Sequence, residues 1–336
     1  MKRIPSLDGL RAISILLVVL GHLAKSSHAP QIYWDYYATT GVRVFFVISG
    51  YLITTILLKE QNRTATISLQ TFYIRRAYRI FPAALFFMLA MVVVYWRDLR
   101  WYNIAAAFLY AANFDAFRPW IFGHLWSLSV EEQFYLLWPS VLKYWYRSRV
   151  AILFGVVVFA PIGEAILYFL KFPGGNIGAF PGVAGNLAAG CLLAMFATRL
   201  PRIKPVWAVA MLLAVILIPL YDANTRERTL FLIFGLNPML HFSIAGLLLH
   251  VVQVPYRFLN WQPVAWLGRI SYSLYLWQQP FCADPKLRSG YFAVFALFAA
   301  CLSYYLIEQP MLRRREKKMS TPDVMVSTEK VCTTAA

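Results

Sequence analysis

Charged residues are scarce in this chain of 336 residues, and acidic ones are the scarcest. Charged side chains make up 14% of the sequence, with 15 Asp and Glu against 32 Lys and Arg. A soluble globular domain carries about 25% charged residues. The chain is instead 60% hydrophobic, with a mean hydropathy of +0.57. This composition excludes an ordinary soluble protein and favours one that is surrounded by lipid.

Cysteine and histidine are also few, and neither has the spacing of a metal site. The four cysteines, Cys191, Cys282, Cys301 and Cys332, are scattered and give no disulfide framework. The sequence has no glycine-rich phosphate loop, no His-x-x-x-His pair and no internal repeat. We therefore expect neither a metal ion nor a tightly bound cofactor.

Apolar windows bounded by charge predict an all-α integral membrane protein. A spanning helix needs about 20 mostly apolar residues. Ten such windows lie near residues 8–26, 37–59, 79–97, 127–146, 149–170, 179–198, 205–221, 229–252, 264–283 and 290–308. The first has no small-residue cleavage site, so we expect a retained span and not a signal peptide. The shorter apolar segment 103–117 is predicted to be re-entrant or interfacial.

The basic residues explain the orientation of this bundle better than they explain a nucleic-acid partner. The formal net charge is +17, but Lys and Arg lie between apolar runs and form no basic soluble face. With about ten crossings, most of them fall on the side of both termini, which is then cytoplasmic. We expect a multi-pass protein of the cytoplasmic (inner) membrane, with one membrane domain over 1–310. The basic segment 311–336 is predicted to be a disordered cytosolic tail.

The first span carries polar side chains that lipid should exclude. A charge deep in a span costs about 2.5–3.5 kcal/mol, so Asp8, Arg11 and His22 are expected to face the bundle interior or a wet cavity. Arg11 and His22 are eleven positions apart and return to nearly the same helix face. Asp8 can pair with Arg11 at i,i+3. A satisfied interhelical hydrogen bond remains an alternative for a single histidine.

Two further segments combine polar or small residues with aromatics. Ser49 and Gly50 stand among large side chains in the second span, where small residues permit close helix approach or leave space for a ligand. Before the third span, Arg75, Arg76 and Arg79 form a cationic fork if that segment is helical. Arginine forks bind phosphates bidentately, although anionic lipid head groups or membrane topology would also require basic residues there.

The segment from His124 to Tyr135 places two adjacent carboxylates at the start of an apolar span. Neighbouring helix residues point about 100° apart, so only one of Glu131 and Glu132 can aim fully at a shared site. We predict one functional and one structural carboxylate. Polar groups recur in 271–280 and 304–310, where hydrogen bonds between helices are the default interpretation.

Together these motifs resemble the acyltransferase-3 family of integral membrane acyltransferases. The matching segments are 7–11 with His22, 41–51, 72–82, 124–139, 271–280 and 304–310, in the family's order along nearly the whole chain. The resemblance implies an O-acyltransferase that moves an acyl group, most often acetyl, from cytosolic acyl-CoA to a glycan hydroxyl. Acetyl-CoA would be a co-substrate, and O-antigen or a similar surface or lipid-linked saccharide the acceptor.

The resemblance also implies roles for particular residues. Arg11 and His22, with Asp8, Glu131 and Glu132, would form the catalytic set. Arg75, Arg76, Arg79 and Ser49 would bind the acyl-CoA, and His124, Trp126 and Tyr275 the acceptor. His22 as a general base would activate the hydroxyl directly, or an enzyme residue would be acylated first; the sequence leaves both open.

The chain departs from the family pattern in two places. Gln278 stands where many relatives carry a histidine after the tryptophan of this motif, so no second titrating base is expected there. Many relatives also append a soluble hydrolase-like domain, and we expect this chain to work alone or with a separate extracytoplasmic partner.

Two other functions remain open at this point. A transporter or flippase would also use polar residues along a span and a basic cytosolic mouth. A purely structural membrane component gives no reason for Arg11, His22, Glu131 and Glu132 to bear the cost of insertion.

Overall fold

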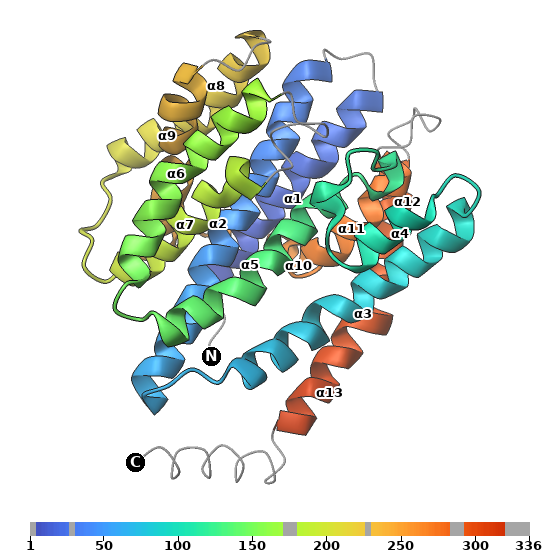
Figure 1. The fold of residues 1–336 in the computed structure, drawn as a ribbon, viewed down its shortest axis with the longest axis horizontal. Coiled ribbons are helices and arrows are strands. Elements are labelled where there is room, and N and C mark those ends of the chain that lie inside the picture. Colours follow the sequence, from blue (N-terminus) through green and yellow to red (C-terminus); the bar gives the residue numbers. More distant parts are fainter. Residues whose placement is uncertain (1–4, 27–30, 171–179, 226–229, 283–291, 320–336) are drawn as a thin grey trace.

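The computed structural model describes residues 5–26, 31–170, 180–225, 230–282 and 292–319, and every regular element in these ranges is a helix (Figure 1). The α-helices are α1 (Pro5–Ser26), α2 (Gln31–Thr64), α3 (Leu69–Tyr95), α4 (Trp101–Phe108), α5 (Leu125–Tyr144), α6 (Arg149–Phe169), α7 (Phe180–Phe196), α8 (Pro205–Thr225), α9 (Asn237–Gln253), α10 (Gln262–Arg269), α11 (Ser271–Cys282), α12 (Phe292–Ser303) and α13 (Gln309–Met319). Short 3-10 turns, η1 (Ala112–Phe114) and η2 (Trp120–Phe122), precede α5, and π turns, η3 (Leu232–Leu236) and η4 (Tyr304–Glu308), precede α9 and α13.

Seven of the described helical segments are long and apolar enough to cross a membrane, which confirms a multi-pass helical membrane protein. They are Ser6–Ala24, Asp35–Thr64, Leu69–Tyr95, Arg149–Phe169, Pro205–Asn224, Leu232–Gln253 and Phe292–Lys318. The apolar helix α7 is shorter, and the predicted spans at 127–146 and 264–283 coincide with α5 and with the α10–α11 pair. The count of about ten crossings and the cytoplasmic termini remain predictions.

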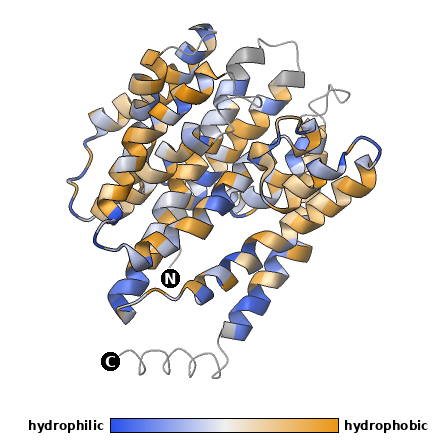
Figure 2. Ribbon diagram, in the orientation of Figure 1, coloured by the Kyte–Doolittle hydropathy of each residue, from blue (hydrophilic) through white to orange (hydrophobic). Residues whose placement is uncertain are grey.

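Helix α2 is the central element of the bundle. Of its apolar window 67% is buried inside the protein, against 17% for α6. It packs against α1, α7, α8, α9 and α5 (Figure 1). Large apolar side chains of the outer helices, such as Leu89 and Val93 of α3 and Phe159 of α6, are exposed. Soluble proteins rarely expose large contiguous apolar surfaces, so these faces are suited to lipid. Polar residues collect at the ends of α2, α3 and α13 (Figure 2).

Glycines let α2 approach its neighbours closely. A Cβ at Gly50 would collide with the backbone carbonyl of Leu187 on α7, and one at Gly190 with that of Val47 on α2. The sequence analysis left two interpretations open for the small residues of the second span, close helix approach and space for a ligand. Gly50 serves close helix approach, whereas its neighbour Ser49 faces a different direction, into a pocket described below.

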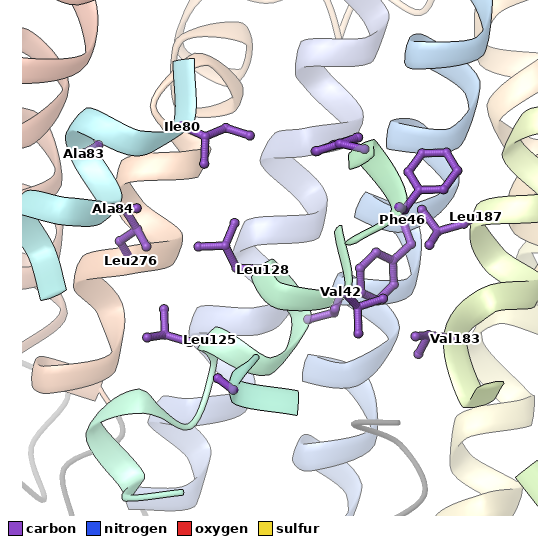
Figure 3. Packing of buried hydrophobic residues seen from close by; sticks show 14 of the residues in the cluster. Val42, Phe46, Ile80, Ala83, Ala84, Leu125, Leu128, Val183, Leu187 and Leu276 are labelled. Carbon is purple, nitrogen blue, oxygen red and sulfur yellow. The ribbon is translucent and has the colours of Figure 1, made fainter. Parts of the chain in front are cut away.

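The main apolar core joins helices that are far apart in sequence. Val42 and Phe46 of α2 lie between Val183 and Leu187 of α7 on one side and Leu125 and Leu128 of α5 on the other (Figure 3). Across from α5, the cluster continues through Ile80, Ala83 and Ala84 of α3 to Leu276 of α11. This core fixes α2, α3, α5 and α11 relative to one another, and these helices, with α1, carry the candidate site.

Helix boundaries differ from the predictions in ways that affect function. Helix α3 begins at Leu69, before the predicted start of the third span at 79, so the segment with Arg75, Arg76 and Arg79 is helical. Ser68 caps its start by accepting a hydrogen bond from the backbone N–H of Thr71 at 3.3 Å. The predicted boundary at 310 falls inside α13, which makes 311–319 helical, whereas 320–336 lie outside the described residues.

The segments predicted to be irregular form short helices. Residues 103–117 contain most of α4 and all of η1, neither of which is long enough to cross a bilayer. The predicted span 264–283 is broken at Ile270 into α10 and α11. The break lets α11 pack against α1, α3 and α12 independently of α10.

We predict that Gly50→Ala lowers the Tm of the purified protein in detergent by the equivalent of about 1–3 kcal/mol, since its methyl group would press on the α7 backbone. The matched control is Gly155→Ala in α6, where the added Cβ meets only Phe159, at 4.0 Å. Because alanine favours helix over glycine by about 1 kcal/mol, Gly155→Ala should leave the Tm unchanged or raise it. Equal shifts in both variants would contradict the packing role of Gly50.

Candidate functional site

A pocket opens where α1, α2, α3, α5 and α11 meet. The free volume of this pocket is about 80 Å³. Its lining consists of Arg11, Val42, Phe45, Phe46, Ser49, Arg76, Arg79, Ile80, Ser127, Leu128, Glu131, Ser271, Tyr272 and Tyr275. Cationic and hydroxyl groups therefore converge on an otherwise apolar and aromatic cavity.

Glu131 is the polar centre of this pocket. Its Oε1 accepts hydrogen bonds from the hydroxyls of Ser49 on α2 and Tyr135 on its own helix, and it lies 3.4 Å from Nη2 of Arg76 on α3. The Arg76 guanidinium also stacks over the Tyr135 ring, 3.6 Å from its centroid. A single carboxylate thus ties α2, α3 and α5 together at the wall of the pocket.

The three predicted donor-binding arginines are placed differently from one another. Arg76 and Arg79 line the pocket, whereas Arg75 is exposed and is not part of the lining. Arg76 is partly neutralised by Glu131, and only 18% of its side chain is accessible. Arg79 forms no ion pair within the described residues, and it adds its positive charge to the cavity lining.

Arg11 adds a third guanidinium to the same cavity. It lies on α1, and its Nη1 is 3.8 Å from Oδ1 of Asp8 one turn earlier, which is the i,i+3 pair expected from the sequence. The backbone of Asp8 contacts Gly268 of α10 so closely that a Cβ there would collide with its carbonyl oxygen. Asp8 therefore holds Arg11 and also seats α1 against α10.

The two adjacent glutamates are separated as their helical geometry requires. Glu131 lines the pocket, while Glu132 does not, and the buried Oε1 of Glu132 has no hydrogen-bond partner within the described residues. The structure thus assigns the pocket-facing position to Glu131. The functional role of either carboxylate remains a prediction.

His22 lies further along α1 and is outside the pocket lining. Its Nδ1 is 2.6 Å from Oε1 of Gln278 on α11, so the residue that departs from the family pattern contacts the predicted catalytic histidine. The spacing of eleven residues predicted that Arg11 and His22 share one face of the helix. In the structure Arg11 lines the cavity beside α11, and His22 contacts α11 itself. No pattern in the sequence predicted the His22–Gln278 contact, because the two residues lie in different helices, 256 positions apart.

Tyr275 connects the pocket to the region of His22. Its hydroxyl is 2.5 Å from that of Ser127, and both hydroxyls contact the carbonyl oxygen of His124, at 3.0 and 3.1 Å. The His124 ring packs against the rings of Tyr275 and Phe87, with centroids 5.4 and 5.3 Å apart. Tyr275 and Gln278 are one turn apart on α11, so the pocket and the His22 region adjoin along this helix.

His124 is buried beside the pocket, Trp126 is partly buried there, and neither lines the cavity. His124 is 4% exposed, and neither of its ring nitrogens has a hydrogen-bond partner among the described residues. Trp126 packs edge-on against Phe46, which does line the pocket, with ring centroids 6.1 Å apart. Of the three predicted acceptor-binding residues, Tyr275 alone borders the cavity.

Several polar residues escaped the sequence analysis. Tyr135 appeared there only as the end of the carboxylate segment, although its i,i+4 spacing from Glu131 was a usable signal. A second buried group lies away from the pocket: Arg43 of α2 donates to Asn237 of α9 at 3.3 Å, which donates to Glu164 of α6 at 3.4 Å. Glu164 was detectable as a carboxylate within an apolar run, and its hydrogen bond accounts for it structurally.

Comparison with known proteins shows which proteins this chain is similar to. A family model described as an acyltransferase domain matches residues 4–307. The chain is 31% identical to the peptidoglycan O-acetyltransferase OatA of Listeria monocytogenes, over 92% of this chain and 56% of that protein. It is 32% identical to the putative peptidoglycan O-acetyltransferase YrhL of Bacillus subtilis (92% and 55%) and 30% identical to the O-acetyltransferase OatA of Staphylococcus aureus (83% and 50%).

The chain spans about half the length of these curated relatives. No solved structure matches it. The family model nevertheless covers almost all of the described helices, including every helix that contributes to the pocket. The resemblance drawn from the sequence motifs is confirmed: this chain belongs to the family of proteins that carry this acyltransferase domain.

Proposed function

We propose that this protein is an O-acetyltransferase that moves an acetyl group from cytosolic acetyl-CoA to a hydroxyl of a cell-envelope glycan. The observation that carries the proposal is the pocket that contains three arginines and Glu131. Tyr275 and Ser127 connect this pocket to the neighbouring region where His22 of α1 contacts α11. A phosphate-bearing donor needs the cations, and hydroxyl transfer needs a base.

The arginine end of the pocket suits the donor. Guanidinium groups bind phosphate oxygens bidentately, and Arg11, Arg76 and Arg79 approach the cavity from two helices. All three lie toward the helix ends that the predicted topology places in the cytoplasm. The pantetheine arm would extend along the apolar wall formed by Phe45, Ile80 and Leu128.

His22 is the proposed general base. A neutral imidazole accepts a proton near neutral pH, so it can activate a sugar hydroxyl as that oxygen attacks the thioester carbon. The oxygen–carbon bond forms as the carbon–sulfur bond breaks, and the proton held by His22 passes to the departing CoA thiolate. An acyl-enzyme route remains open beside this direct one.

The relatives change the order in which the possible acceptors should be tested. The sequence analysis favoured O-antigen, whereas two of the relatives are named peptidoglycan O-acetyltransferases. Peptidoglycan is therefore the first acceptor to test, with lipopolysaccharide second. The cytoplasmic membrane as location, and a separate extracytoplasmic partner that assists outward transfer, belong to the same proposal.

The proposal predicts that membranes containing the protein transfer radiolabelled acetyl from acetyl-CoA to envelope glycan, and that His22→Ala lowers this rate about 10²–10⁴-fold, the usual contribution of a general base. CoA release is measured in parallel, because it reports donor cleavage even when an acceptor is missing. The matched control is His250→Ala in α9, where the histidine instead contacts Tyr256 and the backbone of Ile203. Rates are divided by the amount of folded protein.

The location of the label separates the remaining possibilities. Label in muropeptides supports peptidoglycan as the acceptor, and label in lipopolysaccharide supports O-antigen. Wild-type membranes that neither release CoA nor transfer label would overturn the acyltransferase proposal. Full transfer by folded His22→Ala would remove His22 from the mechanism while leaving the activity intact.

A second prediction concerns the arginines of α3. Arg79→Met should raise the KM for acetyl-CoA about 10–100-fold, since a hydrogen bond to a charged group contributes about 1.5–3 kcal/mol. The neighbouring Arg75→Met is the control: this side chain is exposed and does not line the pocket, so its KM should stay near that of wild type. Equal effects of the two substitutions would indicate a general attraction of anions by the basic helix end.

A further inference from the structure

We propose that Gln278 is a positioning residue that holds the His22 imidazole in its Nδ1–H form, through a chain of side-chain amides anchored on the backbone of Trp120. The contacts are Trp120 O to Gln279, Gln279 to Gln278 and Gln278 to His22. The consequence for turnover rests on the function proposed above, whereas the state of the ring can be tested without it.

The direction of each hydrogen bond follows from its fixed end. The carbonyl oxygen of Trp120 can only accept, so the group of Gln279 that lies 2.5 Å from it must be the amide NH₂. The other end of that amide, Oε1 of Gln279, can also only accept. It therefore faces the NH₂ of Gln278, at 3.3 Å.

A second contact fixes the orientation of Gln278 independently. Its Nε2 also lies 3.5 Å from the backbone carbonyl oxygen of Tyr275, one turn earlier on α11. Turning the amide over would place an oxygen against two acceptors, Tyr275 O and Gln279 Oε1, in a site where Gln278 is fully buried. The carbonyl oxygen of Gln278 is thus directed at His22.

The tautomer of His22 follows from this oxygen. Oε1 of Gln278 has no proton to give, so at 2.6 Å the Nδ1 of His22 must be the donor. In a neutral imidazole the other nitrogen, Nε2, then carries the lone pair. An enzyme that uses histidine as a base needs one nitrogen to be the acceptor reliably, and the amide chain specifies which one.

The local structure is built to hold this chain. Gln279 reaches the carbonyl of Trp120 in the turn η2, where a Cβ on the following Gly123 would lie 3.1 Å from Nε2 of Gln279. Gln278 and Gln279 are 0% and 6% exposed, so water competes little for these bonds. Burial of two neighbouring amides in an apolar helix is costly unless both ends are satisfied, and here they satisfy each other and His22.

The experiment uses the full-length protein in lipid nanodiscs with ¹⁵N- and ¹³C-labelled histidine. The chain has five histidines, and the His22 signals are identified by their loss in His22→Ala. The ring shifts distinguish Nδ1–H from Nε2–H. We expect Nδ1–H in wild type, and a mixed or Nε2–H ring in Gln278→Met, which keeps the side-chain length and removes the acceptor.

Two further variants make the test specific. Gln279→Met removes the anchor and leaves Gln278 in place, so it should also release the His22 ring, but less completely. Gln253→Met is the matched control: Gln253 of α9 likewise bonds the backbone at both ends, to Ile203 N at 3.1 Å and Pro201 O at 3.3 Å, away from His22. Its His22 spectrum should be that of wild type. Tm values confirm that each variant is folded.

Kinetics give the second readout. Gln278→Met should lower kcat about 10–100-fold, the typical effect of losing a partner that orients a functional histidine, with the KM for acetyl-CoA unchanged. A wild-type ring protonated at Nε2, or a Gln278→Met variant with unchanged ring shifts and kcat, would overturn the inference. If wild type shows no acetyl transfer, the proposed function fails, and the ring spectrum still decides whether Gln278 sets the tautomer.

Discussion

A charged or polar group inside a membrane must find its partners within the protein, and this constraint organises the whole bundle. Water is absent from the hydrocarbon region, so an unsatisfied carboxylate or guanidinium there costs several kcal/mol. Glu131 meets this demand with Ser49, Tyr135 and Arg76. The ion pair and its hydrogen bonds therefore hold three helices together and also form part of the cavity wall. Removing these side chains would remove contacts that stabilise the fold.

The polar contacts depend in turn on close helix packing. Gly50 and Gly190 let the backbones of α2 and α7 touch, which presses α2 into the centre of the bundle with Ser49 turned toward α5. The apolar cluster of Val42, Phe46 and Leu128 then sets the distance between α2 and α5. Because interiors are close-packed, a shift of one helix would displace the groups on every other.

Helix α11 links the arginine-lined pocket to the region of His22. Tyr275 borders the arginine-lined pocket, and Gln278, one turn later, contacts His22. The helix can take this place because the chain breaks at Ile270 and so frees α11 from the direction of α10. In the proposed function, donor recognition and proton transfer would thus occur at neighbouring turns of one short helix. This arrangement would bring the cytosolic donor close to the outward-facing acceptor.

The sequence by itself determined the class of the protein, because apolar run length and charge scarcity are local properties that follow from the thickness of a bilayer. It also determined the family, since the motifs with Arg11, His22, Arg76 and Glu131 keep their order along the chain. Helical periodicity was enough to pair Asp8 with Arg11 and to turn Glu131 and Glu132 apart.

Only the tertiary structure decided which of these residues meet. It separated Arg75 from Arg76 and Arg79, joined Glu131 to Ser49 across helices, and showed that Gln278 contacts His22 from 256 positions away. Such contacts depend on how helices cross, which is set by the summed packing of many side chains, and no local pattern in the sequence encodes them.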